Sequence, residues 1–351
     1  MVSVEDRSKR LLESAQKIQS PFVLDESLCL YSPQDNVDSL QHPRIVEWMK
    51  FVEYEYEPRL PKGTRNILLF MPCTKTKPYP FSSEHKAINQ RLLDEGFKPS
   101  GRIYLPQELQ ARLEPPFSQE VLNLSPLVNG AGTVVHRMVI SEPLGVVPYE
   151  HIAEFRGKQS PAVSYDDPGL FEGRGNAVSP WRSDCTAKRC SATRWEWGRE
   201  ERRHYVLMHN AMAETVAKVV ARIDHHYDDI IAWVAPGLTH RSFVLARDER
   251  SANNVPATRQ VGSKKMELVG ANDHLPGKPI CSLPTREQCR VALERLAGRL
   301  NVSVAKANGI YARGGVGATP LALPELLDAL VERIGRVSAE EVTEKAWNAR
   351  L

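Results

Sequence analysis

A short stretch of the sequence, residues 72–85, brings together side chains that suit covalent chemistry. It carries a thiol, an ammonium group, a phenol, a hydroxyl and an imidazole, supplied by Cys73, Lys77, Tyr79, Ser82 and His85. A cysteine reacts as its thiolate, and a nearby ammonium group, imidazolium or helix N-terminus lowers its pKa from about 8.5. The stretch therefore predicts a cysteine that attacks an electrophilic carbon, with His85 moving protons. A small core cysteine beside solvated lysines is the alternative that the pattern leaves open.

The reactive stretch directly follows a segment that has the pattern of a buried strand. Residues 65–71 form a short apolar run bounded by turn residues, which is typical of a strand buried on both faces. An amphipathic helix is predicted before it, over residues 43–57. After the stretch, Ser82 or Ser83 can cap a helix that runs to about Glu95. Ligands of open α/β sheets bind at the carboxyl ends of strands, and this loop begins at such an end.

Two later segments repeat the arrangement of a predicted strand followed by polar residues. Residues 133–140 precede a loop at 141–148, and residues 229–234 precede His240 and Arg241. Helices that alternate with short buried strands predict an α/β fold with a mainly parallel sheet flanked by helices, with helical N- and C-terminal extensions. We expect an N-terminal extension, an α/β core and a C-terminal helical segment, which span residues 1–38, 39–300 and 301–351.

The composition is that of an ordinary globular protein. The 351 residues are 42% hydrophobic and carry a net charge of +3, which excludes wholesale disorder. No apolar run approaches the roughly 20 residues needed to cross a bilayer, and the N-terminus lacks the apolar core of a signal peptide. Six cysteines are too few for a small disulfide-stapled domain. We therefore expect a cytoplasmic protein with reduced thiols and no membrane partner.

The spacing Pro-Cys-x3-Lys-Pro-Tyr-x2-Ser-x2-His in residues 72–85 resembles the signature of the archaeosine synthase core domain, from a family related to tRNA-guanine transglycosylases. The likeness continues outside this motif. Residues 141–148 are similar to the family's Ser-Pro-Leu-Gly-Val-Val-Pro segment, and residues 165–168 are similar to a Tyr-Asp-x-Pro element. It covers roughly residues 40–300, thinly after 170, and the first motif is the most specific part.

This resemblance implies chemistry at the nitrile of 7-cyano-7-deazaguanine installed in nucleic acid. Archaeosine synthase joins the ε-amine of free lysine to the nitrile carbon, and a partner radical enzyme cleaves the resulting amidine. Cys73 would be the covalent nucleophile, because a thiolate adds to a nitrile carbon to give a thioimidate, and His85 would be the acid/base. The other motif residues, Lys77, Tyr79 and Ser82, would orient the nitrile and stabilise charge on its nitrogen.

Residues outside the nucleophile loop are expected to bind the substrates. Asp166 and Asp167 are candidates for recognising the amino acid co-substrate, and His240 and Arg241 stand at a strand end. The predicted substrate-binding residues are Pro72, Ser141, Gly145, Asp166, Asp167, His240 and Arg241. No metal and no cofactor is expected, and lysine is the expected co-substrate. Residues 185–209 contain two cysteines and two histidines, but their spacing is looser than that of usual structural zinc sites.

The domain organisation does not decide which nucleic acid the protein acts on, or whether it is an enzyme. The 351 residues are too short to hold the barrel domain and the RNA-binding tail of full-length archaeosine synthase as well, so we expect contacts to tRNA to be missing or supplied by a transglycosylase or radical-enzyme partner. Modification of DNA or of the free base is therefore an alternative to tRNA. A non-catalytic nucleic-acid-binding or accessory subunit of a transglycosylase complex is the alternative of a different class. Its best nucleic-acid surface would be the mixture of Trp181, Trp195 and Trp197 with nearby cations.

Overall fold

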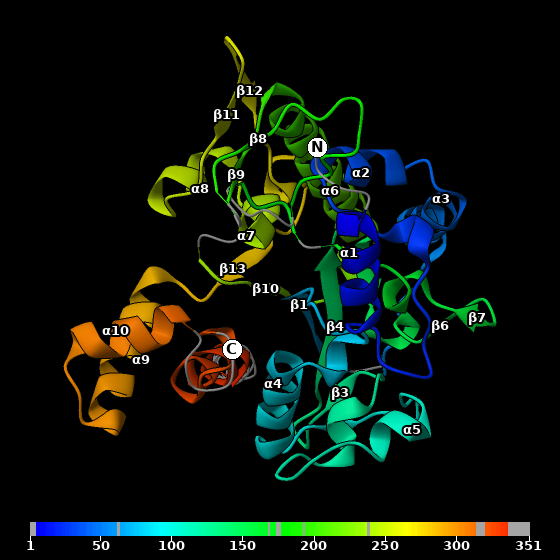
Figure 1. The fold of residues 1–351 in the computed structure, drawn as a ribbon. Helices are drawn as coiled ribbons and strands as arrows, with labels where there is room; N and C mark the ends of the chain where they lie inside the picture. The colour runs from blue at the N-terminus through cyan, green and yellow to red at the C-terminus, as the bar shows by residue number, and fades with distance from the viewer. Residues whose placement is uncertain are drawn as a thin grey trace.

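The computed structural model describes residues 5–61, 64–167, 169–172, 177–191, 194–236, 239–313 and 320–335. Its centre is a seven-stranded sheet with the order β13-β10-β1-β4-β3-β2 (Figure 1). The seventh strand, β5, pairs with residues 138–141 of β4, beyond the part of β4 that pairs with β3. The parallel strands are β13 (Cys281–Leu283), β10 (Asp229–Trp233), β1 (Arg65–Pro72) and β4 (Thr133–Ser141). The antiparallel strands are β3 (Leu127–Val128), β2 (Lys98–Pro99) and β5 (Gly145–Pro148). The predicted α/β fold with a mainly parallel sheet is confirmed.

The first predicted strand lies in the middle of the sheet. β1 pairs in parallel with β10 on one side and with β4 on the other, and its residues 67–71 are fully buried. A strand covered on both faces needs apolar side chains at successive positions, which explains the unbroken run Ile67–Met71. Because β1 is central, the loop after Pro72 opens between the ends of two neighbouring strands.

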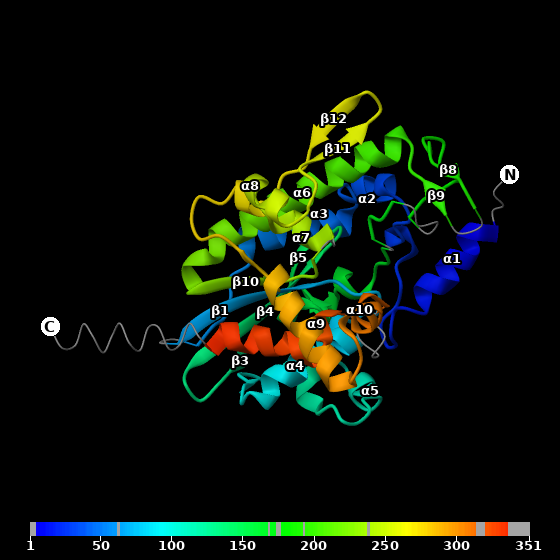
Figure 2. The ribbon, with the colours of Figure 1, turned by 90° about the vertical axis from the view of Figure 1, so that its left-hand side faces the viewer.

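Helices cover both faces of the sheet. The 25-residue helix α6 (Arg199–Ile223) lies on one side with α2 (Pro33–Ser39) and α3 (Pro43–Lys50), as Figure 2 shows. α4 (Ser83–Asp94) and α9 (Arg286–Leu300) lie on the other side. The helix predicted over residues 43–57 is present as α3, which continues into a π-helical turn at Phe51–Glu55 and ends there.

The remaining elements are shorter and lie around this frame. They are α1 (Glu5–Ala15), α5 (Gln107–Gln110), α7 (Thr239–Val244), α8 (Arg247–Ala252), α10 (Val304–Arg313), a helical stretch at 324–335 and the two-stranded sheets β6–β7, β8–β9 and β11–β12. None of the described helices is both long and apolar enough to cross a bilayer. The end of the predicted C-terminal segment, residues 336–351, lies outside the described residues, and the division into three segments stays a prediction.

Gly145 joins β4 to β5 and allows α6 to approach the sheet. Its φ is +70°, and a Cβ there would lie 2.3 Å from Cγ2 of Thr215 on α6. We expect Gly145→Ala to destabilise the protein by about 2 kcal/mol or more in urea unfolding, from backbone strain and overpacking. Thr215→Ser removes Cγ2 and keeps the hydroxyl, so the double variant should recover part of the loss. Equal stability of Gly145→Ala and the wild type would contradict this close approach.

Candidate active site

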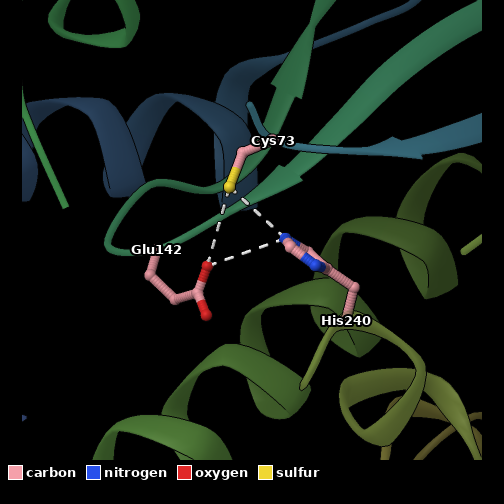
Figure 3. A group of neighbouring side chains, drawn as sticks. All are labelled: Cys73, Glu142 and His240. Atoms are coloured by element: carbon pink, nitrogen blue, oxygen red, sulfur yellow. Dashed lines mark hydrogen bonds and ion pairs between the residues drawn. The ribbon is translucent and has the colours of Figure 1, made fainter. Parts of the chain in front are cut away.

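Three loops at the carboxyl edge of the parallel sheet bring a thiol, a carboxyl group and an imidazole together. Cys73 follows β1, Glu142 follows β4, and His240 lies in the first turn of α7, after β10. The Cys73 sulfur lies 3.3 Å from Nε2 of His240 and 4.0 Å from Oε2 of Glu142. Nε2 and Oε2 are 3.8 Å apart, and the three groups point toward one another (Figure 3). The cluster has the composition of a nucleophile with an acid and a base.

The sheet order explains why residues so distant in sequence meet. Pro72 pairs with Ile140 in β4, and Phe70 pairs with Ala232 in β10, so the three strands end at nearly the same level. His240 and Cys73 were predicted as site residues from their places after strands. Glu142 was not predicted, although a carboxylate directly after the strand end was the signal that could have found it.

The thiol of Cys73 is protonated at rest. Burial is the largest cause that raises its pKa, the Glu142 carboxyl raises it further, and Lys77 and a hydrogen bond with Ser141 oppose these effects. The sequence predicted the opposite, a pKa lowered by a lysine, an imidazolium and a helix N-terminus. The difference arises because desolvation of the thiolate exceeds the attraction of Lys77. Cys73 must therefore lose its proton to a neighbouring base when it attacks.

Burial also sets the charge states of the two partners. It raises the pKa of the Glu142 carboxyl to about 7, so a large part of this group holds a proton near neutral pH. It lowers the pKa of His240 to about 4, so the imidazole is neutral there. A neutral imidazole 3.3 Å from the sulfur can accept the thiol proton, and the protonated carboxyl can donate one. The resting site thus holds one base and one acid beside the nucleophile.

Three hydroxyl groups form a hydrogen-bonded cluster that reaches the thiol through Ser141. The Tyr79 hydroxyl lies 3.0 Å from Oγ of Ser141 and 2.9 Å from the Tyr165 hydroxyl, and Ser141 also bonds Tyr165. Lys77 is 2% exposed; its Nζ lies 4.3 Å from the centre of the Tyr165 ring and donates to the Thr74 carbonyl at 3.2 Å. Burial lowers the Lys77 pKa. The predicted residues Lys77, Tyr79 and Ser141 therefore gather at the site.

The two predicted aspartates occupy different environments. Oδ2 of Asp166 accepts from Ser14 Oγ at 2.6 Å and from Lys17 Nζ at 2.5 Å, which links the last turn of α1 and the residues just after it to this loop. Oδ1 of Asp167 accepts from the Gly169 amide at 2.9 Å, and burial raises its pKa to about 8. Glu142 also raises the Asp167 pKa, and Asp167 raises that of Cys73. Asp167 therefore acts electrostatically on Cys73 and Glu142, whereas Asp166 holds the N-terminal residues against this loop.

Several predicted site residues have structural roles instead. Ser82 caps α4, where its hydroxyl accepts from the His85 amide at 3.2 Å. Gly145 packs against α6, as described above. Nη2 of Arg241 donates to the carbonyls of Val234 and Pro284, at 2.9 and 2.6 Å, and thereby links the ends of β10 and β13. These residues were predicted from their sequence positions, but in the structure they cap a helix, pack against a helix or join two strand ends.

His85 does not lie beside the Cys73 sulfur as a proton carrier. It is fully buried, its Nε2 donates to the Pro72 carbonyl at 2.9 Å, and its Nδ1 accepts from the Tyr149 hydroxyl at 2.6 Å. Burial lowers its pKa to about 4, so the ring is neutral near pH 7. Because Pro72 precedes Cys73, the imidazole fixes the backbone from which the thiol projects. This corrects the predicted acid/base role, and it gives Pro72 a structural contact through its carbonyl.

We expect His85→Phe to destabilise the fold by about 2 kcal/mol or more in urea unfolding. The substitution removes the imidazole donor to the buried Pro72 carbonyl and the acceptor of the Tyr149 hydroxyl, and a buried polar group left unpaired costs about 1–3 kcal/mol. The matched control is His225→Phe at an exposed histidine, which should change stability by less than about 0.5 kcal/mol. A His85→Phe protein with wild-type stability but no reaction at Cys73 would restore the acid/base role.

Two other sequence patterns do not form sites among the described residues. The ligand atoms close enough to share a metal ion, in the part of the chain that the structure describes, are those of Cys73, Glu142 and His240. That donor set could hold zinc, a capacity that the sequence did not predict, while the cysteines and histidines of residues 185–209 do not gather. In the predicted aromatic surface, Trp197 is buried and bonded to the Ala177 carbonyl, and Trp181 is 38% exposed.

No protein-family model, curated protein or solved structure matches this chain. The basis for its function is therefore the convergence of Cys73, Glu142 and His240, together with the residue spacing of 72–85. Pro168 and Arg174, which belong to the similar Tyr-Asp-x-Pro element and the adjacent loop, lie outside the described residues.

Proposed function

We propose that the protein is an amidine-forming transferase that acts on the nitrile of a 7-cyano-7-deazaguanine base. The observation that supports this most is the thiol of Cys73 within 4.0 Å of both an imidazole and a carboxyl group. A nitrile carbon is an electrophile for a thiol, and its nitrogen needs a proton as the bond forms. The motif of residues 72–85 resembles that of archaeosine synthase and supplies the identity of the base.

The first step is addition of the Cys73 thiol across the carbon–nitrogen triple bond. The sulfur forms a bond to the nitrile carbon while His240 accepts the thiol proton through Nε2. One π bond of the nitrile breaks, and its nitrogen takes a proton from the Glu142 carboxyl. The product is a thioimidate that links Cys73 to the base, with Glu142 left as a carboxylate and the thiol proton held by His240 for the leaving sulfur of the next step. No atom is lost in this step.

The second step transfers the base to an amine. The neutral amine nitrogen attacks the thioimidate carbon, the carbon–sulfur bond breaks, and the thiolate of Cys73 leaves and regains a proton. The amine loses one proton to the site as it attacks, and the thiolate of Cys73 takes up one proton. The overall reaction therefore converts a nitrile and an amine into an amidine, with no atom lost. Lysine is the amine donor that the family resemblance implies. A reduced thiol is required throughout, which fits the expected cytoplasmic location.

The nucleic acid that carries the base is the open part of this proposal. A base inside a duplex must leave its stack before its edge can enter a buried site. Either tRNA or DNA could present it, and a transglycosylase partner would install it first. A radical enzyme would be the partner that consumes the amidine. An accessory subunit that only binds the modified base would need a binding site for the base but not the reactive sulfur.

The test is incubation of the protein with cyano-deazaguanine tRNA, the matching DNA and the free base, each with lysine. Nucleoside mass spectrometry should show a mass gain of one lysine on one of them, and intact protein mass should show the adduct on Cys73 when lysine is omitted. A gain of one water would keep the thioimidate but contradict amine transfer. Absence of both the adduct and the product on all three substrates would contradict the enzyme and favour the binding subunit.

A further inference from the structure

Among the described residues, two carboxyl groups that act electrostatically on the reactive sulfur or contact it, Asp167 and Glu142, form no ion pair with a lysine or an arginine. Glu142 is 2% exposed, and its one basic neighbour within ion-pair distance is the neutral His240, at 3.8 Å. Asp167 forms no ion pair with any described residue; its contacts are the Gly169 amide and Nδ2 of Asn36, at 2.9 and 3.5 Å. The neighbouring Asp166, by contrast, binds Lys17 at 2.5 Å. The described part of the chain therefore supplies a cationic partner to Asp166 and none to Glu142 or Asp167.

Lys77 does not fill this gap. Its Nζ donates to the Thr74 carbonyl and lies over the Tyr165 ring, and it forms no direct ion pair with either acid, although its charge lowers the pKa of both. A buried carboxylate without a partner is costly, and such groups normally pair with a cation or hold a proton. The raised pKa values of Glu142 and Asp167 indicate that these groups hold a proton when no ligand is bound.

Buried acceptor atoms next to these acids also lack donors. Oδ1 of Asn36, in a residue that is 1% exposed, accepts no hydrogen bond, although Nδ2 of the same amide contacts Asp167. Oδ1 of Asp166 is likewise buried without a donor. Buried polar atoms are nearly always hydrogen-bonded, so these unpartnered acceptors on Asn36, which contacts Asp167, and on the adjacent Asp166 call for a ligand rich in donors. A primary ammonium group has three donors and no acceptor.

We propose that Asp167 and Glu142 bind the ammonium head of the amine donor beside Cys73. This inference rests on the proposed transferase function and specifies its second substrate as a cationic primary amine. Binding at this place would also activate the donor, because an ammonium ion must lose one proton before its nitrogen can attack the thioimidate. A carboxylate of the pair takes that proton, and the amine then stands next to the carbon bonded to sulfur.

The test measures binding without turnover, through protection of the Cys73 thiol. Iodoacetamide, a neutral reagent, alkylates the protein in the presence of L-lysine or L-norleucine, and peptide mass spectrometry follows Cys73. Lysine should slow the alkylation, whereas norleucine, which lacks only the terminal ammonium group, should have no effect at the same concentration. Asp167→Asn should raise the lysine concentration for half protection by about tenfold or more. Glu154→Gln, at an exposed acid on β6 (Glu154–Phe155), is the matched control and should leave it unchanged.

Equal protection by norleucine, or equal behaviour of Asp167→Asn and Glu154→Gln, would overturn the ammonium site. If urea unfolding shows that Asp167→Asn is not folded, Glu142→Gln tests the same pair of acids. The two proposals fail separately, because the thioimidate forms without an amine. An adduct on Cys73 with no preference for lysine would reject this site alone, and selective lysine binding with no adduct would reject the transferase alone.

Discussion

Cys73→Ser should abolish the mass adduct with the cyano-deazaguanine base and reduce turnover by on the order of 10³-fold or more. A serine hydroxyl is a far weaker nucleophile than a thiolate, and His240, with its pKa lowered by burial, is too weak a base to ionise it. The substitution keeps the size of the side chain, so the fold should be unchanged. Intact-protein mass spectrometry without lysine measures the adduct, and nucleoside analysis measures turnover.

The matched control for this prediction is Cys190→Ser. Cys190 is also a free cysteine, but it is exposed and lies outside the cluster, so the variant should keep both the adduct and the turnover. Together the two variants separate loss of one particular thiol from loss of any thiol. An adduct that persists in Cys73→Ser and disappears in Cys190→Ser would place the nucleophile elsewhere.

Glu142→Gln should lower the rate of adduct formation by about 10²–10⁴-fold and remove its dependence on pH near neutrality. The carboxyl must be protonated to donate to the nitrile nitrogen, and burial raises its pKa to about 7. The wild-type rate should therefore be full below pH 7 and fall as the pH rises above it. Glutamine cannot supply that proton, so the variant should be slow at every pH from 6 to 9, a range set by this pKa.

The control for the second prediction is Glu108→Gln, at an exposed acid of α5, which should keep the wild-type rate and pH profile. Rates are measured as the appearance of the protein adduct over time, at each pH. A Glu142→Gln profile that still falls above pH 7 would show that another group supplies the proton. In that case Asp167, whose pKa is raised to about 8 by burial, becomes the donor to test.

The residues that form the centre of the sheet could be predicted from local pattern. The unbroken apolar run Ile67–Met71 can be satisfied only where both faces of a strand are covered, so a central strand followed by a polar loop was expected. The same reasoning located the ends of β4 and β10. The position of Cys73 at a strand end, and the mainly parallel α/β fold, followed directly from these patterns.

Which side chains meet at the sulfur was decided by the tertiary structure. The pattern of an apolar run shows where a strand ends but not which strands become neighbours, and the order β10-β1-β4 is what brings His240 and Glu142 to Cys73. His85, only twelve residues after Cys73, turns away because its two ring nitrogens bind Pro72 and Tyr149. Burial, which depends on all the surrounding layers, then raises the thiol pKa that sequence proximity to lysine was expected to lower.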